Sequence, residues 1–461
     1  MGLEGTFQST LDIEVVDQNQ ISLFNGQILL NPSISKLNFY AFLSHTITFS
    51  LVIIPVQLFQ IPLLGNHYNL PLDDQRTLMS ILNLVNLILK IFLASFFGKL
   101  CDTLGRKPMI IFGVIGLAGT VFLMPHLPGV YPYYILLSIV VDIAALSLTI
   151  PPLLADYIDY DTKGRAAGGM AVLTYLSAFV STYFNQNINF QEDLTSRFHL
   201  CAILILVLGL FIATFGLKGG LYHKIIDKKV HEAKRRLSLV SSEDENHTPL
   251  AETGQGEMPP GFQAGIQEAR NNPWILTGYI CAFVSAAHIG LSGYVLITYM
   301  SHLAGEAGES QAITLTNVQL GVSVVFALIF GFYTDKYNKF KIIVILLLSS
   351  MLNALFLILT PTPFHFFAYF AAFWNGIASS GFLTLTTQVL SKYPSEKYRA
   401  SVGAVGSIFS VIGNAIINII GMFLSTFEAR TPFLMYLAIG AFGSFFLFDL
   451  YRRKRTILDN L

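Results

Sequence analysis

The sequence predicts an all-α polytopic membrane protein with twelve transmembrane helices in two pseudo-symmetric six-helix bundles. Of the 461 residues, 53% are hydrophobic and only 12% are charged, about half the charged share of a typical soluble domain. A soluble protein of this length needs a charged surface that this chain cannot supply. The apolar runs are long enough for membrane helices, which need about 20 mostly apolar residues. They are also too long, and alternate too little, for transmembrane strands.

The apolar runs follow one another in a six-plus-six order. They lie at about 37–62, 75–99, 108–126, 131–155, 165–187, 198–217, 273–300, 313–334, 341–360, 364–390, 399–424 and 431–450. Most connections between them are short. The long segment 218–272 separates an N-terminal bundle (37–217) from a C-terminal bundle (273–450), and its polar, Gly- and Pro-rich part predicts partial disorder. Residues 1–36 and the basic stretch 451–461 form the two tails.

Lysine and arginine residues predict the orientation in the membrane. With the N-terminus placed inside, inside segments contain 24 of the 28 Lys and Arg residues, outside segments contain three, and Lys90 lies within a run. Cytosolic segments of membrane proteins carry such an excess. We therefore expect a multi-pass protein with both termini cytosolic, and the host membrane stays open.

A charged motif occurs twice, once in each half. The stretch FGKLCDTLGRKPMI at 97–110 aligns with FGFYTDKYNKFKII at 330–343 at an offset of 233 residues. A second pair of stretches, around Arg165 and Arg399, aligns at an offset of 234. Two motifs that share one offset to within a residue indicate a duplicated six-helix unit.

These motifs resemble the major facilitator superfamily, and the resemblance covers most of the chain. The signature of that family between helices 2 and 3 is G-x-x-x-D-x-x-G-R-[RK], and an acidic residue often ends helix 4 before an R-[GA]-x-A-like turn. Asp156 and Arg165 occupy the latter places. The second copy departs from the signature at Asn338 and Phe340, and Leu390 stands opposite Asp156. The five signature positions here are Gly98, Asp102, Gly105, Arg106 and Lys107.

The resemblance implies alternating access, in which two bundles rock about a midplane site. It implies that Asp102 meets the N-terminus of helix 11, where the helix dipole favours a negative charge. Arg106 would pair with Asp156, and these contacts would exist only while the inner side is closed. The simpler alternative is that the charges only set topology. The predicted gating residues are Gly98, Asp102, Gly105, Arg106, Lys107, Asp156, Arg165, Gly331, Asp335 and Arg399.

Polar residues within the runs predict a binding site. Lys90 lies 12 residues before Asp102, and Asp142 lies 14 residues before Asp156, which places both about 18–21 Å deep. We expect them to face each other. Intramembrane charges usually serve function, although a pair that only locks the bundle is the alternative. By the resemblance, which places helices 1, 4, 7 and 10 around the cavity, His45, His288 and Asn375 are further candidates.

No motif of a soluble enzyme is present, since P-loop, G-x-G-x-x-G, H-E-x-x-H and G-x-S-x-G patterns are missing from the sequence. The three cysteines lack metal-ligand spacing. We therefore expect no enzyme and no cofactor. The predicted function is a secondary active or facilitative transporter of a small organic solute, and the alternative is a transporter-like receptor or structural subunit. Expected partners are the solute, a proton or another coupling ion, and membrane lipids, but no nucleic acid, for a monomeric protein.

Overall fold

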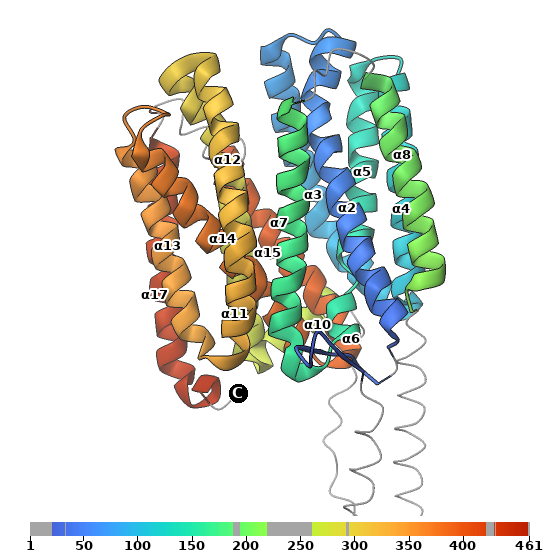
Figure 1. The fold of residues 1–461 in the computed structure, drawn as a ribbon, viewed down its shortest axis with the longest axis vertical. Coiled ribbons are helices and arrows are strands. Elements are labelled where there is room, and N and C mark those ends of the chain that lie inside the picture. Colours follow the sequence, from blue (N-terminus) through green and yellow to red (C-terminus); the bar gives the residue numbers. More distant parts are fainter. Residues whose placement is uncertain are drawn as a thin grey trace, which may run out of the picture.

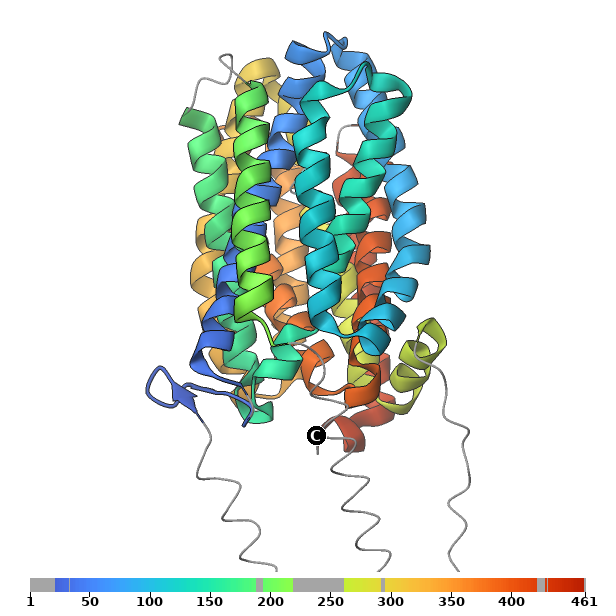
Figure 2. The same cartoon turned by 90° about the vertical axis from the view of Figure 1, so that its right-hand side faces the viewer.

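The structure is a computed structural model that describes residues 21–32, 34–187, 194–218, 261–291, 295–420, 428 and 430–459. Long helices run side by side and form two groups, one from each half of the chain (Figure 1). The view turned by 90° shows the long helices of both groups running roughly parallel from one end of the bundles to the other (Figure 2). The all-α, two-bundle fold class is confirmed.

The first bundle consists of seven helical segments. They are α2 (Lys36–Pro62), α3 (Leu72–Leu104), α4 (Arg106–Leu123), α5 (Ile135–Thr149), α6 (Leu153–Tyr157), α7 (Lys163–Asn187) and α8 (Leu194–Phe211). Short helical turns join or extend them at η1 (Leu63–His67), η2 (Met124–His126), η3 (Val130–Tyr134), η4 (Tyr160–Thr162) and η5 (Ile212–Gly216).

The second half also consists of helices joined by short turns. Its helices are α10 (Phe262–Asn271), α11 (Pro273–Gly290), α12 (Leu296–Lys336), α13 (Lys339–Leu359), α14 (Phe366–Lys392), α15 (Arg399–Ala415) and α17 (Thr431–Asp459), with turns η7 (Glu396–Tyr398) and η8 (Ile416–Ile420). The range of α12 includes a sharp turn, because Ala304 and Gly305 have non-helical backbone angles. Its first part therefore ends the seventh apolar run and its second part forms the eighth. Within the described residues, each predicted run is mostly helical, although the fourth run (131–155) is interrupted at residues 150–152, between α5 and α6.

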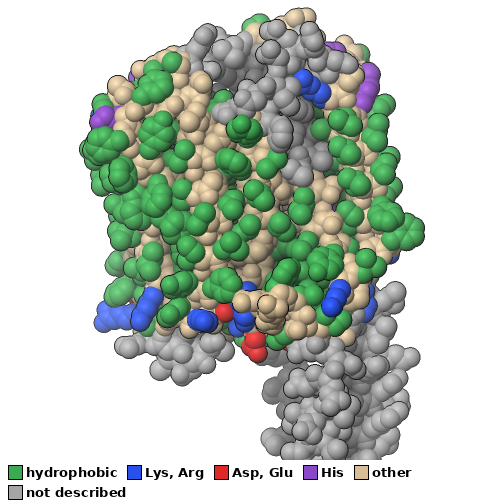
Figure 3. All heavy atoms as spheres, viewed as in Figure 1, with side chains coloured by type: hydrophobic (Ala, Val, Ile, Leu, Met, Phe, Trp, Pro, Cys, Tyr) green, Lys and Arg blue, Asp and Glu red, His purple; other side chains and the backbone are tan. Residues whose placement is uncertain are grey.

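Apolar surface and charge are distributed as a lipid bilayer requires. Hydrophobic side chains cover the middle of the molecule, whereas Lys and Arg gather at one end (Figure 3). We call this end, which carries Asp102, Asp156 and Asp335, the charged end. Phe92 and Phe442 are each 71% exposed, which is unfavourable in water and favourable in lipid. In the described part of the chain, seven helices are long and apolar enough to cross a membrane.

Each bundle has its own core, and two smaller clusters join the bundles. One cluster packs α3 and α5 against α15 and includes Ala94, Cys101 and Ala404. The other packs α7 against α12 through Tyr175 and Ala327. The bundles therefore touch mainly where α3 packs on α15 and where α7 packs on α12, and α7 also contacts α14.

Glycine allows the closest of these approaches. A Cβ atom on Gly98 would lie 2.6 Å from the Cβ of Ala404. At the related position in the other interface, a Cβ on Gly331 would lie 2.9 Å from the Cα of Gly168. Any larger residue at these places would push the bundles apart.

The chain outside the bundles is partly ordered. Within the predicted tail, residues 21–32 form a hairpin of β1 (Ser22–Leu23) and β2 (Ile28–Leu29), and residues 1–20 lie outside the described residues. Leu30 is fully buried and pairs with Ile158 of the loop between α6 and α7. Most of the predicted central loop, 219–260, also lies outside the described residues, but its end forms α10, which packs on α15.

Candidate functional site

The turn between α3 and α4 depends on Gly105. Its φ of 101° lies in the left-handed region, which residues with a side chain rarely adopt. Its N–H donates to the carbonyl oxygen of Cys101 at 3.2 Å. In the second half, Asn338 stands at this position with an ordinary φ of −57°, and its side chain accepts from the N–H of Phe340 at 2.8 Å. The second copy thus replaces a glycine turn by a capped helix start, which explains its departure from the signature.

Asp102 lies at the N-terminus of α15, a helix of the other half. The N–H groups of Ala400 and Ser401 donate to its carboxylate at 3.2 and 2.9 Å, and the Ser401 hydroxyl donates at 2.8 Å. The first N–H groups of a helix have no partner within it, and the dipole favours an anion there. The Asp102 side chain is only 2% exposed. The expected contact with helix 11 is present.

Asp335 makes the reciprocal contact with α7. The N–H groups of Gly164 and Arg165 each donate to its carboxylate at 2.9 Å. The Arg165 side chain donates at 3.3 Å, and Gln388 donates at 2.9 Å. In both contacts the donors are the second and third residues of the helix. Each half therefore inserts a carboxylate into a helix start of the other half.

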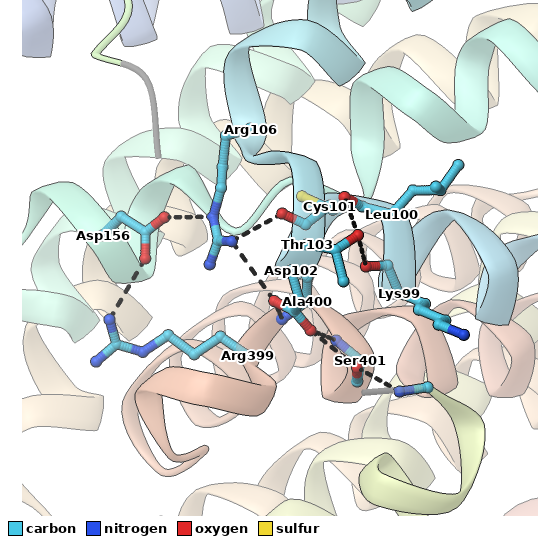
Figure 4. A network of polar contacts seen from close by, with 11 residues as sticks. Lys99, Leu100, Cys101, Asp102, Thr103, Arg106, Asp156, Arg399, Ala400 and Ser401 are labelled. Atoms are coloured by element: carbon cyan, nitrogen blue, oxygen red, sulfur yellow. Dashed lines mark hydrogen bonds and ion pairs between the residues drawn. The ribbon is translucent and has the colours of Figure 1, made fainter. Parts of the chain in front are cut away.

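Asp156 connects two arginines (Figure 4). Nε of Arg106 donates to Oδ2 of Asp156 at 2.8 Å, and Nη1 of Arg399 donates to Oδ1 at 3.4 Å. Arg106 also donates to the carbonyl oxygen of Cys101 at 3.0 Å. Arg106 and Asp156 belong to the first half and Arg399 to the second. Asp156 thus pairs with Arg106 of its own half and with Arg399 of the other half.

Two further gating candidates lie beside this network. Arg165 pairs with Asp335 at 3.3 Å across the bundles. Nζ of Lys107 donates to the carbonyl oxygen of Thr214, at the end of the first bundle, at 2.5 Å. Lys107 therefore links two parts of the first bundle, whereas Arg165 links the two bundles to each other.

Lys90 and Asp142 face each other within the first bundle. Nζ of Lys90 lies 2.5 Å from Oδ1 of Asp142, and their side chains are 27% and 21% exposed. Four residues further along their helices, Ala94 and Leu146 pack toward α15. Since residues four apart share a helix face, the pair points toward the second bundle.

The remaining three binding candidates lie inside the bundles. Nδ1 of His288 and Oδ1 of Asn375 are 2.9 Å apart, and the Asn375 amide donates to Gln319 at 3.0 Å. His288 is fully buried, Asn375 is 4% exposed, and His45 is 8% exposed. His45 borders a small apolar cavity within the first bundle, together with Leu148 and Ile205. Each of the three side chains is thus enclosed within a single bundle, and depth and helix number alone do not reveal which way a side chain points.

Several contributors to the charged end were not singled out from the sequence. Ser401 donates twice to Asp102, and Gln388 holds Asp335. The sequence did contain a signal for Gln388, because it is a polar residue near the end of a predicted run, one helical turn before Lys392. Among the described residues, no group of three or more His, Cys, Asp or Glu side chains could hold a metal ion.

Comparisons with known proteins agree with this architecture. A search of curated protein sequences gives no significant match. The structure resembles the proton:xylose symporter XylE bound to 6-bromo-6-deoxy-D-glucose, with a TM-score of 0.64 and 13% identity over 89% of this chain and 95% of that chain. It also resembles the human organic anion transporter MFSD10, with a TM-score of 0.59 and 11% identity over 89% of this chain and 98% of that chain.

The sequence itself matches the family profile of the Major Facilitator Superfamily over residues 37–362 and 279–459. These two segments overlap and together cover both bundles. The chain therefore belongs to the major facilitator superfamily, and it is an integral multi-pass membrane transporter rather than an enzyme.

Proposed function

We propose that the protein moves a small organic solute by alternating access, as a secondary active or facilitative transporter, and that its charged end acts as a gate. The observation that carries this proposal is the reciprocal insertion of Asp102 into the start of α15 and of Asp335 into the start of α7. Both contacts join opposite bundles, so they break when the bundles separate at this end. They stabilise one of two states, which a transporter of this architecture requires.

The charge balance supports the role of a gate. Asp102 and Arg106 have side chains that are 2% and 4% exposed, so separation of the bundles brings buried charges into water. The hydration of these charges then offsets the breaking of their hydrogen bonds and ion pairs. Such a balance permits two states of similar free energy, whereas a purely apolar interface of this kind would favour closure.

The Lys90–Asp142 pair is the proposed contact for the solute or a coupling ion. It lies about 18–21 Å from the charged end, is partly exposed, and faces the second bundle. A proton or a cationic group on Asp142 would release Lys90, and an anionic group on Lys90 would release Asp142. Either event changes the charge between the bundles and therefore the free energy of their closure.

His288 and Asn375 enter the proposal in a different way. Their hydrogen bonds join α11, α14 and α12 within the second bundle. Tyr436 of α17 contacts the His288 ring, with centroids 5.1 Å apart. We propose that this polar chain keeps the second bundle rigid beside the pathway, and that His45 packs similarly in the first bundle.

Transport into liposomes tests the function. The purified protein would be reconstituted and offered a panel of solutes that begins with sugars and organic anions, because the two structural neighbours carry such solutes. Each uptake is measured with and without a pH gradient. Asp142→Asn is expected to abolish the effect of the gradient on uptake, or uptake itself. The proposal fails if folded protein moves none of the solutes faster than protein-free liposomes.

A further inference from the structure

The second half contains no acidic residue at the place of Asp156, because Leu390 stands there. Arg106 in the first half pairs with Asp156, so its counterpart Lys339 needs another partner. Nζ of Lys339 lies 5.5 Å from the ring centroid of Trp274 and 5.6 Å from that of Tyr393. These rings are stacked, with centroids 5.8 Å apart and planes 11° apart. The rings of Trp274 and Tyr393 therefore contact Lys339, whereas in the first half the Asp156 carboxylate contacts Arg106.

The same kind of contact continues across the two halves. Nζ of Lys392, at the end of α14, lies 3.9 Å from the ring centroid of Tyr160, in the turn before α7. Beside it, Nζ of Lys163 donates to the carbonyl oxygen of Ser391 at 3.0 Å. Lys163 is only 2% exposed. Two lysines thus reach across the interface, one from each half.

We propose that Tyr160 and Lys392 form a cation–π clasp that closes the side of the gate lacking a carboxylate, with Lys163 and Ser391 as the positioning contact beside it. This proposal rests on the proposed function, since it assigns further positioning residues to the same gate. A cation within about 6 Å of an aromatic centroid is attracted by the electron-rich ring face. The 3.9 Å separation of Lys392 from Tyr160 is the shortest cation–ring contact among the described residues.

The ring at the clasp stays uncharged. The Tyr160 side chain is 46% exposed; its partial burial raises the pKa of the phenol, and the neighbouring Asp161 carboxylate adds to this effect. Burial also raises the pKa of the Tyr393 phenol, and the nearby Tyr160 adds to this increase. Lys392 therefore meets a neutral ring around neutral pH, and the attraction is of the cation–π type.

The buried thiol of Cys101 provides a readout that is independent of transport. Cys101 is fully buried in the cluster that joins α3 to α15. Its alkylation by a membrane-permeant maleimide requires that the bundles separate at the charged end. Replacing Cys201 and Cys281 by serine leaves Cys101 as the single reactive thiol.

The experiment compares four variants in this single-cysteine protein. Tyr160→Leu and Lys392→Met are each expected to raise the rate of Cys101 alkylation about two- to fivefold, the change expected for one exposed cation–π contact. Tyr160→Phe keeps the ring and is expected to match the parent. The double variant, Tyr160→Leu with Lys392→Met, is expected to match either single variant, because both remove the same contact.

Three results overturn the clasp. They are an unchanged rate in Tyr160→Leu, equal increases in Tyr160→Phe and Tyr160→Leu, or additive increases in the double variant. Asp102→Asn separates this failure from failure of the gate itself. If Asp102→Asn and Asp335→Asn both raise alkylation and Tyr160→Leu does not, the gate stands and the clasp is wrong. If none of the three changes alkylation, the proposed gate is wrong as well.

Discussion

Asp102→Asn is the most direct test of the gate. The side chain keeps its size but loses its charge, and an NH₂ group replaces one carboxylate oxygen. In the structure, three donors point at that carboxylate: the N–H of Ala400, and the N–H and hydroxyl of Ser401. An asparagine has one oxygen to receive them, so at least one donor meets another donor.

The expected magnitude follows from burial. Leaving a buried donor without an acceptor costs about 1–3 kcal/mol, and loss of the carboxylate at a helix N-terminus costs up to about 2 kcal/mol in partly buried sites. Because part of this cost is shared between the two effects, we expect about 2–3 kcal/mol. The contact exists only while the charged end is closed, so the equilibrium between closed and open states shifts about 30- to 160-fold.

The assay is alkylation of Cys101 in the single-cysteine protein. When opening is fast relative to alkylation, the rate is proportional to the open population, so Asp102→Asn is expected to raise it at least about 30-fold. Cys101 lies next to Asp102 in sequence, so the charge change also affects the thiol directly. Asp335→Asn is the matched control, because it weakens the reciprocal contact from the other half.

The gate predicts increased alkylation in both variants, together with reduced solute uptake at unchanged protein levels in the membrane. An increase in Asp102→Asn alone would trace the effect to the neighbouring thiol and refute the reasoning. Alkylation within twofold of the parent in both variants would do the same.

Three other predictions concern the binding pair, the helix interface and the hairpin. Lys90→Met or Asp142→Asn is expected to lower uptake at least about tenfold, since each leaves the partner charge within the membrane without its ion pair. Exchange of the two residues is expected to restore part of the uptake, and no restoration would argue against direct pairing. Gly98→Val places a Cβ atom 2.6 Å from the Cβ of Ala404 and is expected to expose Cys101 and stop uptake. Gly119→Val is the control, because Gly119 has open space around it, and this variant is expected to retain uptake. Asn31→Ala removes the hydrogen bond, 2.7 Å long, that the Asn31 amide donates to the carbonyl oxygen of Asp156. Loss of about 0.5–1.5 kcal/mol implies that Cys101 alkylation rises about two- to tenfold. An unchanged rate would show that the hairpin does not support the gate.

The sequence by itself determined the number and positions of the membrane helices, because apolar length and charge are local properties. Each of the twelve apolar runs is mostly helical in the part of the chain that the structure describes. The repeat at an offset of 233 residues located Asp102 and Asp335, the carboxylate that each half inserts into a helix start of the other. The depth of Lys90 and Asp142 along their helices also followed from counting residues, since the helical rise is constant.

The pairings of Asp102, Arg106 and Lys90 were expected from the sequence and the family resemblance, but only the tertiary structure decided the remaining partners. Arg165 and Arg399 are equivalent in the repeat, yet one pairs with Asp335 and the other with Asp156, each across the interface. His288 and Asn375 lie at the expected depth, but they are buried within one bundle rather than exposed between the two. The loss of a carboxylate at Leu390 was visible in the sequence, whereas the aromatic contacts of Lys339 and Lys392 were not. The direction of a side chain around its helix, and the neighbour it meets, depend on how helices far apart in sequence pack together.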